Sequence, residues 1–300
     1  VNDFSLAAGT YSAAVVALET ASGTETVSGA GNVALTALEG DLDADLSVIT
    51  TTGTKTVAVS DNQGVVSFTG DLGSGFTTSV GTGSTLSATA AVLDGQTISG
   101  VGAAVVSDDL SNNLGVDLSG VSVGIAATET AGGTFTAGAD FGAAAITIDT
   151  TGQEVDLQAA GVAGVDASTF IVNDGTLVIT HAQVDAISNT AAITGSEGNI
   201  TVIAGSDTAT GVSALLDDGN TQSSTALVKV NMSGAGTLTF DLPSDDNDTL
   251  VLEAGSIINF GVGGTLVVAD GELDARNLSV DSGDWSGVTN VRVNSGLSLT

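Results

Sequence analysis

The chain of 300 residues contains no cysteine, one proline and only 4 lysines and arginines. Without cysteine it can form no disulfide bond, no zinc–thiolate site and no cysteine nucleophile. The few cations stand against 35 aspartates and glutamates, which gives a formal net charge of −31. This charge excludes nucleic acid as a partner, because phosphate binding requires a cationic surface. No apolar run is long enough to cross a bilayer, so we also expect no membrane insertion.

Aromatic residues are scarce as well, at 3%, although 42% of the residues are hydrophobic. Acidic disordered chains are poor in apolar residues, so this composition predicts a folded chain. A folded chain with this charge holds many carboxylates close together. Bound divalent cations would neutralise them.

A repeat built around phenylalanine runs through the chain. Phe4, Phe76, Phe170 and Phe260 are each followed by a glycine that opens a new strand. Such repetition indicates a modular array, and we expect each phenylalanine to fill the core of its module. The predicted modules are 1–75, 76–169, 170–259 and a partial fourth, 260–300. The incomplete fourth module leads us to expect either an excised piece of a longer protein or one protomer cut near a module edge.

The local pattern predicts an all-β fold. Short segments rich in Val, Ile, Thr and Leu recur between turns, for example 46–50, 55–60 and 237–242. Ala-rich stretches follow some of them and predict short helical turns, including a helix that starts at His181. Ser-Gly steps at Gly29 and Gly100 predict tight turns with positive φ.

Two architectures fit these strands. We favour tandem β-rich modules with a β-solenoid-like arrangement, because a narrow core of stacked small aliphatic side chains needs few aromatics. The alternative is a string of small β-sandwiches, whose facing sheets usually bury Trp, Tyr and Phe.

Aspartate-rich segments are the candidate metal sites. The carboxylates of Asp241, Asp245, Asp246 and Asp248 stand in one loop, and those of Asp41, Asp43 and Asp45 alternate along a segment that we expect to be a strand. Several carboxylates that converge could bind Ca²⁺, a hard cation that prefers oxygen ligands. The alternative is that these aspartates are solvated and serve turn geometry.

The sequence gives little support for an enzyme. His181 is the only histidine, and other modules carry other residues at its position, so we interpret it as a surface substitution. A polysaccharide lyase or hydrolase is a remote alternative, since the four cations are scattered and aromatic sugar platforms are almost absent. We therefore predict no enzyme activity.

The chain resembles the acidic, cysteine-free, repetitive surface proteins that bacteria export by type I secretion, a group that includes S-layer proteins and giant RTX-like adhesins. The resemblance rests on composition and on a pattern of Gly-Thr, strand, Ala-rich helix, Ser/Thr-Gly and a return strand, clearest in 9–35 and 175–202. It implies an extracellular location at the bacterial cell surface and calcium-dependent folding after export.

Our leading hypothesis is a structural protein that self-assembles as a homopolymer into a surface layer or extracellular filament, with cell-surface polysaccharide as a further partner. The alternative is an elongated stalk segment of a secreted adhesin. A stalk should stay monomeric, whereas a layer or filament protein should polymerise.

Overall fold

The computed structural model describes the greater part of the chain. The described residues are 4–18, 26–190, 193–195, 198–203, 223–226, 229–232, 237–241, 249–252, 257–259, 264–268, 272–274 and 288–293. Strands dominate these residues, and the strand pairs within each compact unit are parallel. The predicted mostly-β class is therefore confirmed.

The chain divides into two compact units. Unit 1 comprises Val1–Ala127 with Gly142–Ala144, and unit 2 comprises Thr128–Phe141 with Ala145–Thr300. The division falls inside the predicted module 76–169 and not at its ends. The predicted module boundaries therefore stay predictions.

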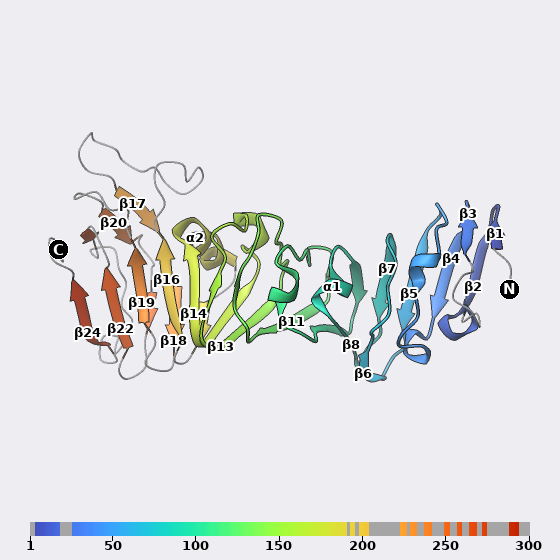
Figure 1. The fold of residues 1–300 in the computed structure, drawn as a ribbon, viewed down its shortest axis with the longest axis horizontal. Helices are drawn as coiled ribbons and strands as arrows, with labels where there is room; N and C mark the ends of the chain where they lie inside the picture. Colours follow the sequence, from blue (N-terminus) through green and yellow to red (C-terminus); the bar gives the residue numbers. More distant parts are fainter. Residues whose placement is uncertain are drawn as a thin grey trace. The chain divides into compact units, whose positions relative to one another are not determined.

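Unit 1 consists of short strands separated by one-turn helices (Figure 1). Its strands are β1 (Phe4–Leu6), β2 (Thr10–Ala14), β3 (Val27–Gly29), β4 (Asn32–Thr36), β5 (Lys55–Val59), β6 (Gly64–Ser67), β7 (Phe76–Val80), β8 (Ser84–Ala88), β9 (Thr97–Gly100), β10 (Ala103–Val106) and most of β11 (Gly124–Glu129). Its helices are η1 (Val15–Leu18), η2 (Leu38–Gly40), η3 (Leu46–Val48), α1 (Ala90–Leu93) and η4 (Leu110–Asn113).

Strands of unit 1 pair with strands that lie a short distance further along the sequence. One sheet has the order β2-β4-β5-β7-β9, and a second run has the order β6-β8-β10-β11. Thr85 lies opposite Ala103, and Phe4 lies opposite Val27, so paired residues are 18 to 23 positions apart. Parallel strands need a crossover connection, and here the residues between two paired strands supply it.

The core of unit 1 is a stack of aliphatic side chains. In β4, β5, β7, β8, β10 and β11 buried residues alternate with more exposed ones, as Val57 and Val59 do on β5. Parallel pairing places Val57 next to Leu35 on one side and Thr78 on the other. Because like positions stack on like positions, small aliphatic residues fill the core without many aromatics.

The Ser-Gly steps end strands β3 and β9, and their glycines have the predicted positive φ. Gly29 and Gly100 have φ angles of 105° and 120°, which L-residues with a side chain rarely adopt. A Cβ on Gly100 would lie 2.2 Å from the carbonyl oxygen of Val80. Only glycine allows the backbone at Gly100 to approach the backbone of Val80 this closely.

Unit 2 has longer strands and one longer helix. Its elements are β12 (Gly133–Thr134), β13 (Ala145–Asp156), η5 (Val162–Gly164), β14 (Thr169–Thr180), α2 (His181–Thr190), β15 (Ile193–Gly195), β16 (Asn199–Ile203), β17 (Ser223–Ala226), β18 (Lys229–Met232), β19 (Thr237–Asp241), β20 (Thr249–Leu252), β21 (Ile257–Asn259), β22 (Gly264–Val268), β23 (Glu272–Asp274) and β24 (Val288–Val293). The strand orders are β13-β14-β16-β19-β22-β24, β14-β15-β18-β21 and β17-β20-β23. The helix predicted to start at His181 is confirmed.

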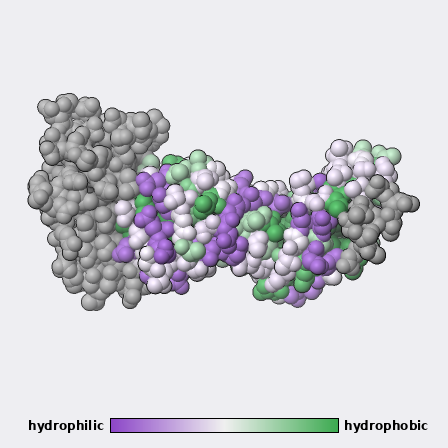
Figure 2. Space-filling model, in the orientation of Figure 1, coloured by the Kyte–Doolittle hydropathy of each residue, from purple (hydrophilic) through white to green (hydrophobic). Residues whose placement is uncertain are grey.

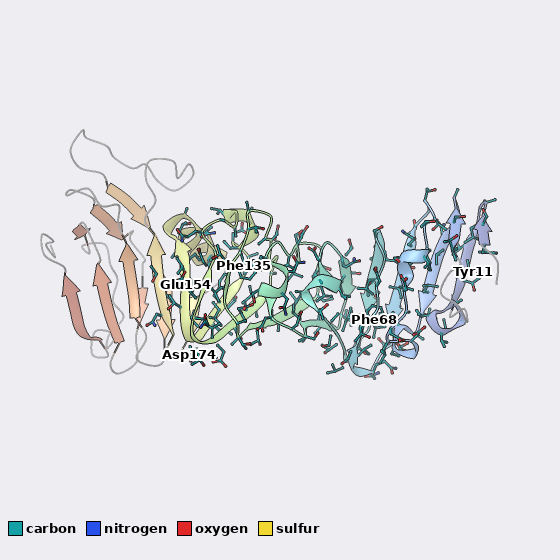
Figure 3. All side chains as sticks on the ribbon, viewed as in Figure 1. Tyr11, Phe68, Phe135, Glu154 and Asp174 are labelled. Carbon is teal, nitrogen blue, oxygen red and sulfur yellow. The ribbon has the colours of Figure 1, made fainter. Side chains whose placement is uncertain are left out.

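Three phenylalanines stack in the core of unit 2. Phe135, labelled in Figure 3, lies 5.2 Å from Phe141, and Phe141 lies 6.4 Å from Phe170, measured between ring centroids. Both pairs are edge-to-face, the arrangement that aromatic quadrupoles favour. The Phe repeat identified only Phe170 of these three.

The structure corrects two other expectations. Phe76 and Phe170 are buried, as predicted for module anchors, but Phe4 is 47% exposed, so that expectation is wrong for Phe4; Phe260 lies outside the described residues. The segment 46–50 contains η3 instead of a strand, because the carboxylate of Asp45 accepts a hydrogen bond from the N–H of Ser47 and starts a helical turn.

Candidate functional site

The aspartates of the described turns shape the turns themselves. Four of them accept a hydrogen bond from the backbone N–H two residues further on: Asp45, Asp71, Asp117 and Asp156. For example, the N–H of Gly73 lies 2.7 Å from Oδ1 of Asp71. This local bond replaces a backbone bond in the turn and explains why aspartate is so frequent here.

Other carboxylates link turns that are far apart in the sequence. Oδ1 of Asp61 accepts from the N–H of Thr82, and Oδ1 of Asp94 accepts from the N–H of Asp117, both at 2.7 Å. Each bond links positions that are 21 and 23 residues apart in the chain. The carboxylates therefore satisfy backbone donors that strand pairing leaves open at the turns.

Glu39 makes the same kind of link and titrates below its ordinary range. Its half-buried carboxylate accepts from the N–H of Ser60 at 3.1 Å. Burial raises the pKa of Glu39, but the hydrogen bonds from the Ser60 side chain and from backbone N–H groups outweigh burial, so the pKa is lowered. The ionised form of Glu39 is thus stabilised by the fold.

The first candidate calcium segment does not form a strand. Asp41 follows η2 and is buried, Asp43 is exposed in a turn, and Asp45 is exposed at the start of η3. The expectation that a strand aligns these three carboxylates on one face is wrong, because two helical turns flank a tight turn here. Calcium binding by Asp41, Asp43 and Asp45 stays a prediction.

The second candidate segment lies mostly outside the described residues. Asp241 ends β19, while Asp245, Asp246 and Asp248 belong to the stretch that is not described. Among the residues that are described, no three His, Cys, Asp or Glu side chains gather closely enough to hold a metal ion.

Two polar side chains that the sequence interpretation missed form hydrogen bonds to backbone segments elsewhere in the chain. Gln183 is 1% exposed; its Nε2 donates to the carbonyl oxygens of Leu157 and Ala160 at 2.7 and 2.8 Å. Its Oε1 accepts from the N–H of Thr180, and Oγ1 of Thr180 accepts from the N–H of Gln183. The spacing Thr-x-x-Gln is a capping box and could have identified Gln183 from sequence.

Lys55 is the second of these polar side chains. Its Nζ donates to the carbonyl oxygens of Ile49 and Ser74 and lies 5.3 Å from the centroid of the Phe76 ring. A cation over an aromatic face is attracted by the ring quadrupole. Lys55 therefore links the backbone at Ile49 to the backbone at Ser74.

Comparison of the chain with models of protein families, with curated proteins and with solved structures gives no match. In the described ranges no helix is both long and apolar enough to cross a membrane.

Proposed function

We propose that the chain is an extracellular structural protein of the bacterial cell surface, folded as a β-solenoid whose copies assemble into a layer or filament. The observation that supports this is the parallel register, in which strand after strand pairs with the corresponding strand of the next turn. In solenoids each turn contacts only its neighbours, so turns can be added without a new core. Such a stack presents the same faces repeatedly, which suits assembly.

The proposal is of a structural protein and not of an enzyme. Among the described carboxylates, several accept backbone hydrogen bonds within turns, as Asp71 and Asp117 do. Lys55, which could neutralise a sugar acid, is held by the carbonyl oxygens of Ile49 and Ser74. These polar groups stabilise turns, which is what a scaffold requires of them.

The proposal includes calcium. This part rests on the formal net charge of −31 and on the carboxylate-rich segment of Asp241, Asp245, Asp246 and Asp248. Cations bound to carboxylates would reduce repulsion within one copy and between copies.

Negative-stain electron microscopy of the purified chain, first with millimolar calcium and then with chelator, tests the proposal. We expect sheets or filaments with calcium and their loss after chelation. Assembly that survives chelation would remove calcium from the proposal and keep the structural role. Separate particles in both conditions would contradict self-assembly and favour a monomeric adhesin stalk.

A further inference from the structure

Unit 1 keeps its charged groups away from its sheets. None of the carboxylates described in this unit lies within a strand; they lie in turns and short helices between strands. Lys55 begins β5, but its Nζ reaches the carbonyl oxygen of Ile49 and the ring of buried Phe76. On the surface drawn in Figure 2, hydrophilic residues are interspersed with neutral and hydrophobic ones. The sheet faces are therefore available for contacts that charge would prevent.

The sheet β2-β4-β5-β7-β9 presents a face built of Ser, Thr and Ala. One row across its five strands, in register, is Ser12, Ala34, Thr56, Thr77 and Thr97. A second row lies two residues further along each strand and includes exposed Ser79. All of these side chains are exposed or half-buried. We call these two rows the uncharged face.

The charge distribution favours a second copy of this chain as the occupant. Each copy has a formal net charge of −31, so the carboxylate-bearing turns of two copies repel each other. The uncharged face allows two copies to approach without bringing carboxylates together. Its short side chains also lose less conformational entropy on packing than the long charged residues usual on surfaces. A cationic partner would instead be drawn to the turns.

We propose that copies of this chain pack against one another through the uncharged face, an inference that rests on the self-assembly proposed above. The Ser, Thr and Ala side chains of the two rows are short, so two such faces can approach each other closely.

The size of the uncharged face sets the strength of one contact. Five strands about 4.8 Å apart, with about five residues each at ~3.3 Å per residue, give an area of roughly 400 Å². Stable protein pairs bury about 800 Å² on each partner. A single pair of copies therefore associates weakly through this face, and an extended assembly requires further contacts on each copy.

Cysteine cross-linking of the full chain tests the inference, because the natural sequence contains no cysteine. Ser79→Cys places one thiol on the uncharged face, and Ser107→Cys places one on an exposed loop after β10 as the matched control. With a short bismaleimide cross-linker, we expect dimers of Ser79→Cys to form faster than those of Ser107→Cys at every protein concentration.

A like charge on the face supplies the second measurement. In the Ser79→Cys background, Thr77→Asp should lower the yield of dimer about tenfold, equivalent to about 1.4 kcal/mol. Ser107→Asp adds the same charge outside the face and should change the yield little. Thermal melting of each variant shows whether it is folded.

The outcomes separate this inference from the proposed function. If wild type assembles but Ser79→Cys cross-links no faster than Ser107→Cys, the uncharged face is not the contact and the structural role stands. If folded Thr77→Asp leaves the yield unchanged, the face is also rejected. If Ser79→Cys cross-links faster while wild type forms no sheets or filaments, the face is a pairwise contact and the proposed function fails.

Discussion

Replacing Thr78 by valine should make the protein more stable. Thr78 on β7 is 0% exposed and faces the core, paired with Val57 on one side and Ile98 on the other. Within the described structure its hydroxyl is buried and has no hydrogen-bond partner. In the unfolded chain the same hydroxyl is hydrated, so folding costs the free energy of removing that water without compensation.

The size of the gain follows from that cost. An unsatisfied buried hydroxyl destabilises the folded state by about 1–3 kcal/mol. Valine keeps the branched shape of threonine, so Thr78→Val removes the polar group without leaving a cavity. We expect the free energy of unfolding, measured by urea denaturation, to rise by about 1–2 kcal/mol. The melting temperature should rise by about 2–8 °C.

Thr150 supplies the matched control. It is also 0% exposed, but its hydroxyl donates to the carbonyl oxygen of Gln153 at 3.0 Å. Thr150→Val should therefore destabilise the protein by about 1 kcal/mol. Equal or reversed signs for the two substitutions would refute the assignment of Thr78 as an unsatisfied group.

Three further predictions address backbone, core and titration. Gly175→Ala should lower the free energy of unfolding by about 3 kcal/mol or more, since φ is +81° and the new Cβ would lie 1.9 Å from the hydroxyl oxygen of Thr150. Gly152 has a φ of +68° but open space around it, so Gly152→Ala should lower the free energy of unfolding by only about 1 kcal/mol. Similar losses in urea denaturation would contradict the predicted clash. Phe170 is buried, so Phe170→Ala should lower the free energy of unfolding by about 3–5 kcal/mol. Phe4 is exposed, so Phe4→Ala should lower it by about 1 kcal/mol or less. An unchanged melting temperature of Phe170→Ala would contradict the role of Phe170 in the core. The lowered pKa of Glu39 stabilises the fold above the unfolded-state pKa of ~4.3, and this contribution is lost as pH falls through the folded-state pKa. Wild type should therefore exceed Glu39→Gln in stability at neutral pH and match it in acid; a difference independent of pH would refute the role of ionised Glu39.

Local sequence patterns predicted many single elements but not how they stack. The segment 55–60 was a recognisable strand, because Val57 and Val59 alternate with smaller residues, and it forms β5. The helix at His181 was likewise predictable from its Ala-rich composition. These features depend on neighbours in sequence, which a single sequence contains in full.

The period of the stack was harder to detect. Paired positions are 18 apart between Thr85 and Ala103 but 23 apart between Phe4 and Val27, so no fixed spacing appears in the sequence. The core requires only a small apolar residue at each stacked position, and many residues satisfy that requirement. The rarer phenylalanines were easier to follow, yet they marked the core only in part, since Phe4 is largely exposed.

The strand expected over the first candidate metal segment was wrong for a related reason. Alternating carboxylates at Asp41, Asp43 and Asp45 have the period of a strand, but Asp45 instead satisfies the N–H of Ser47. A short polar side chain competes with the strand for backbone donors, and at this position the turn is favoured. Composition shows that aspartates are abundant, whereas only the structure shows which backbone groups they occupy.

The variable length of the connections has a consequence for how such a chain can evolve. Phe170 pairs with Ile193, 23 positions on, whereas Ile193 pairs with Val230, 37 positions on, and both pairs belong to the same parallel ladder. Insertions between strands therefore leave the pairing intact as long as the strands keep their alternation. Selection can lengthen, shorten or diversify these connections independently of folding, so their sequences can change while the parallel pairing of the strands persists.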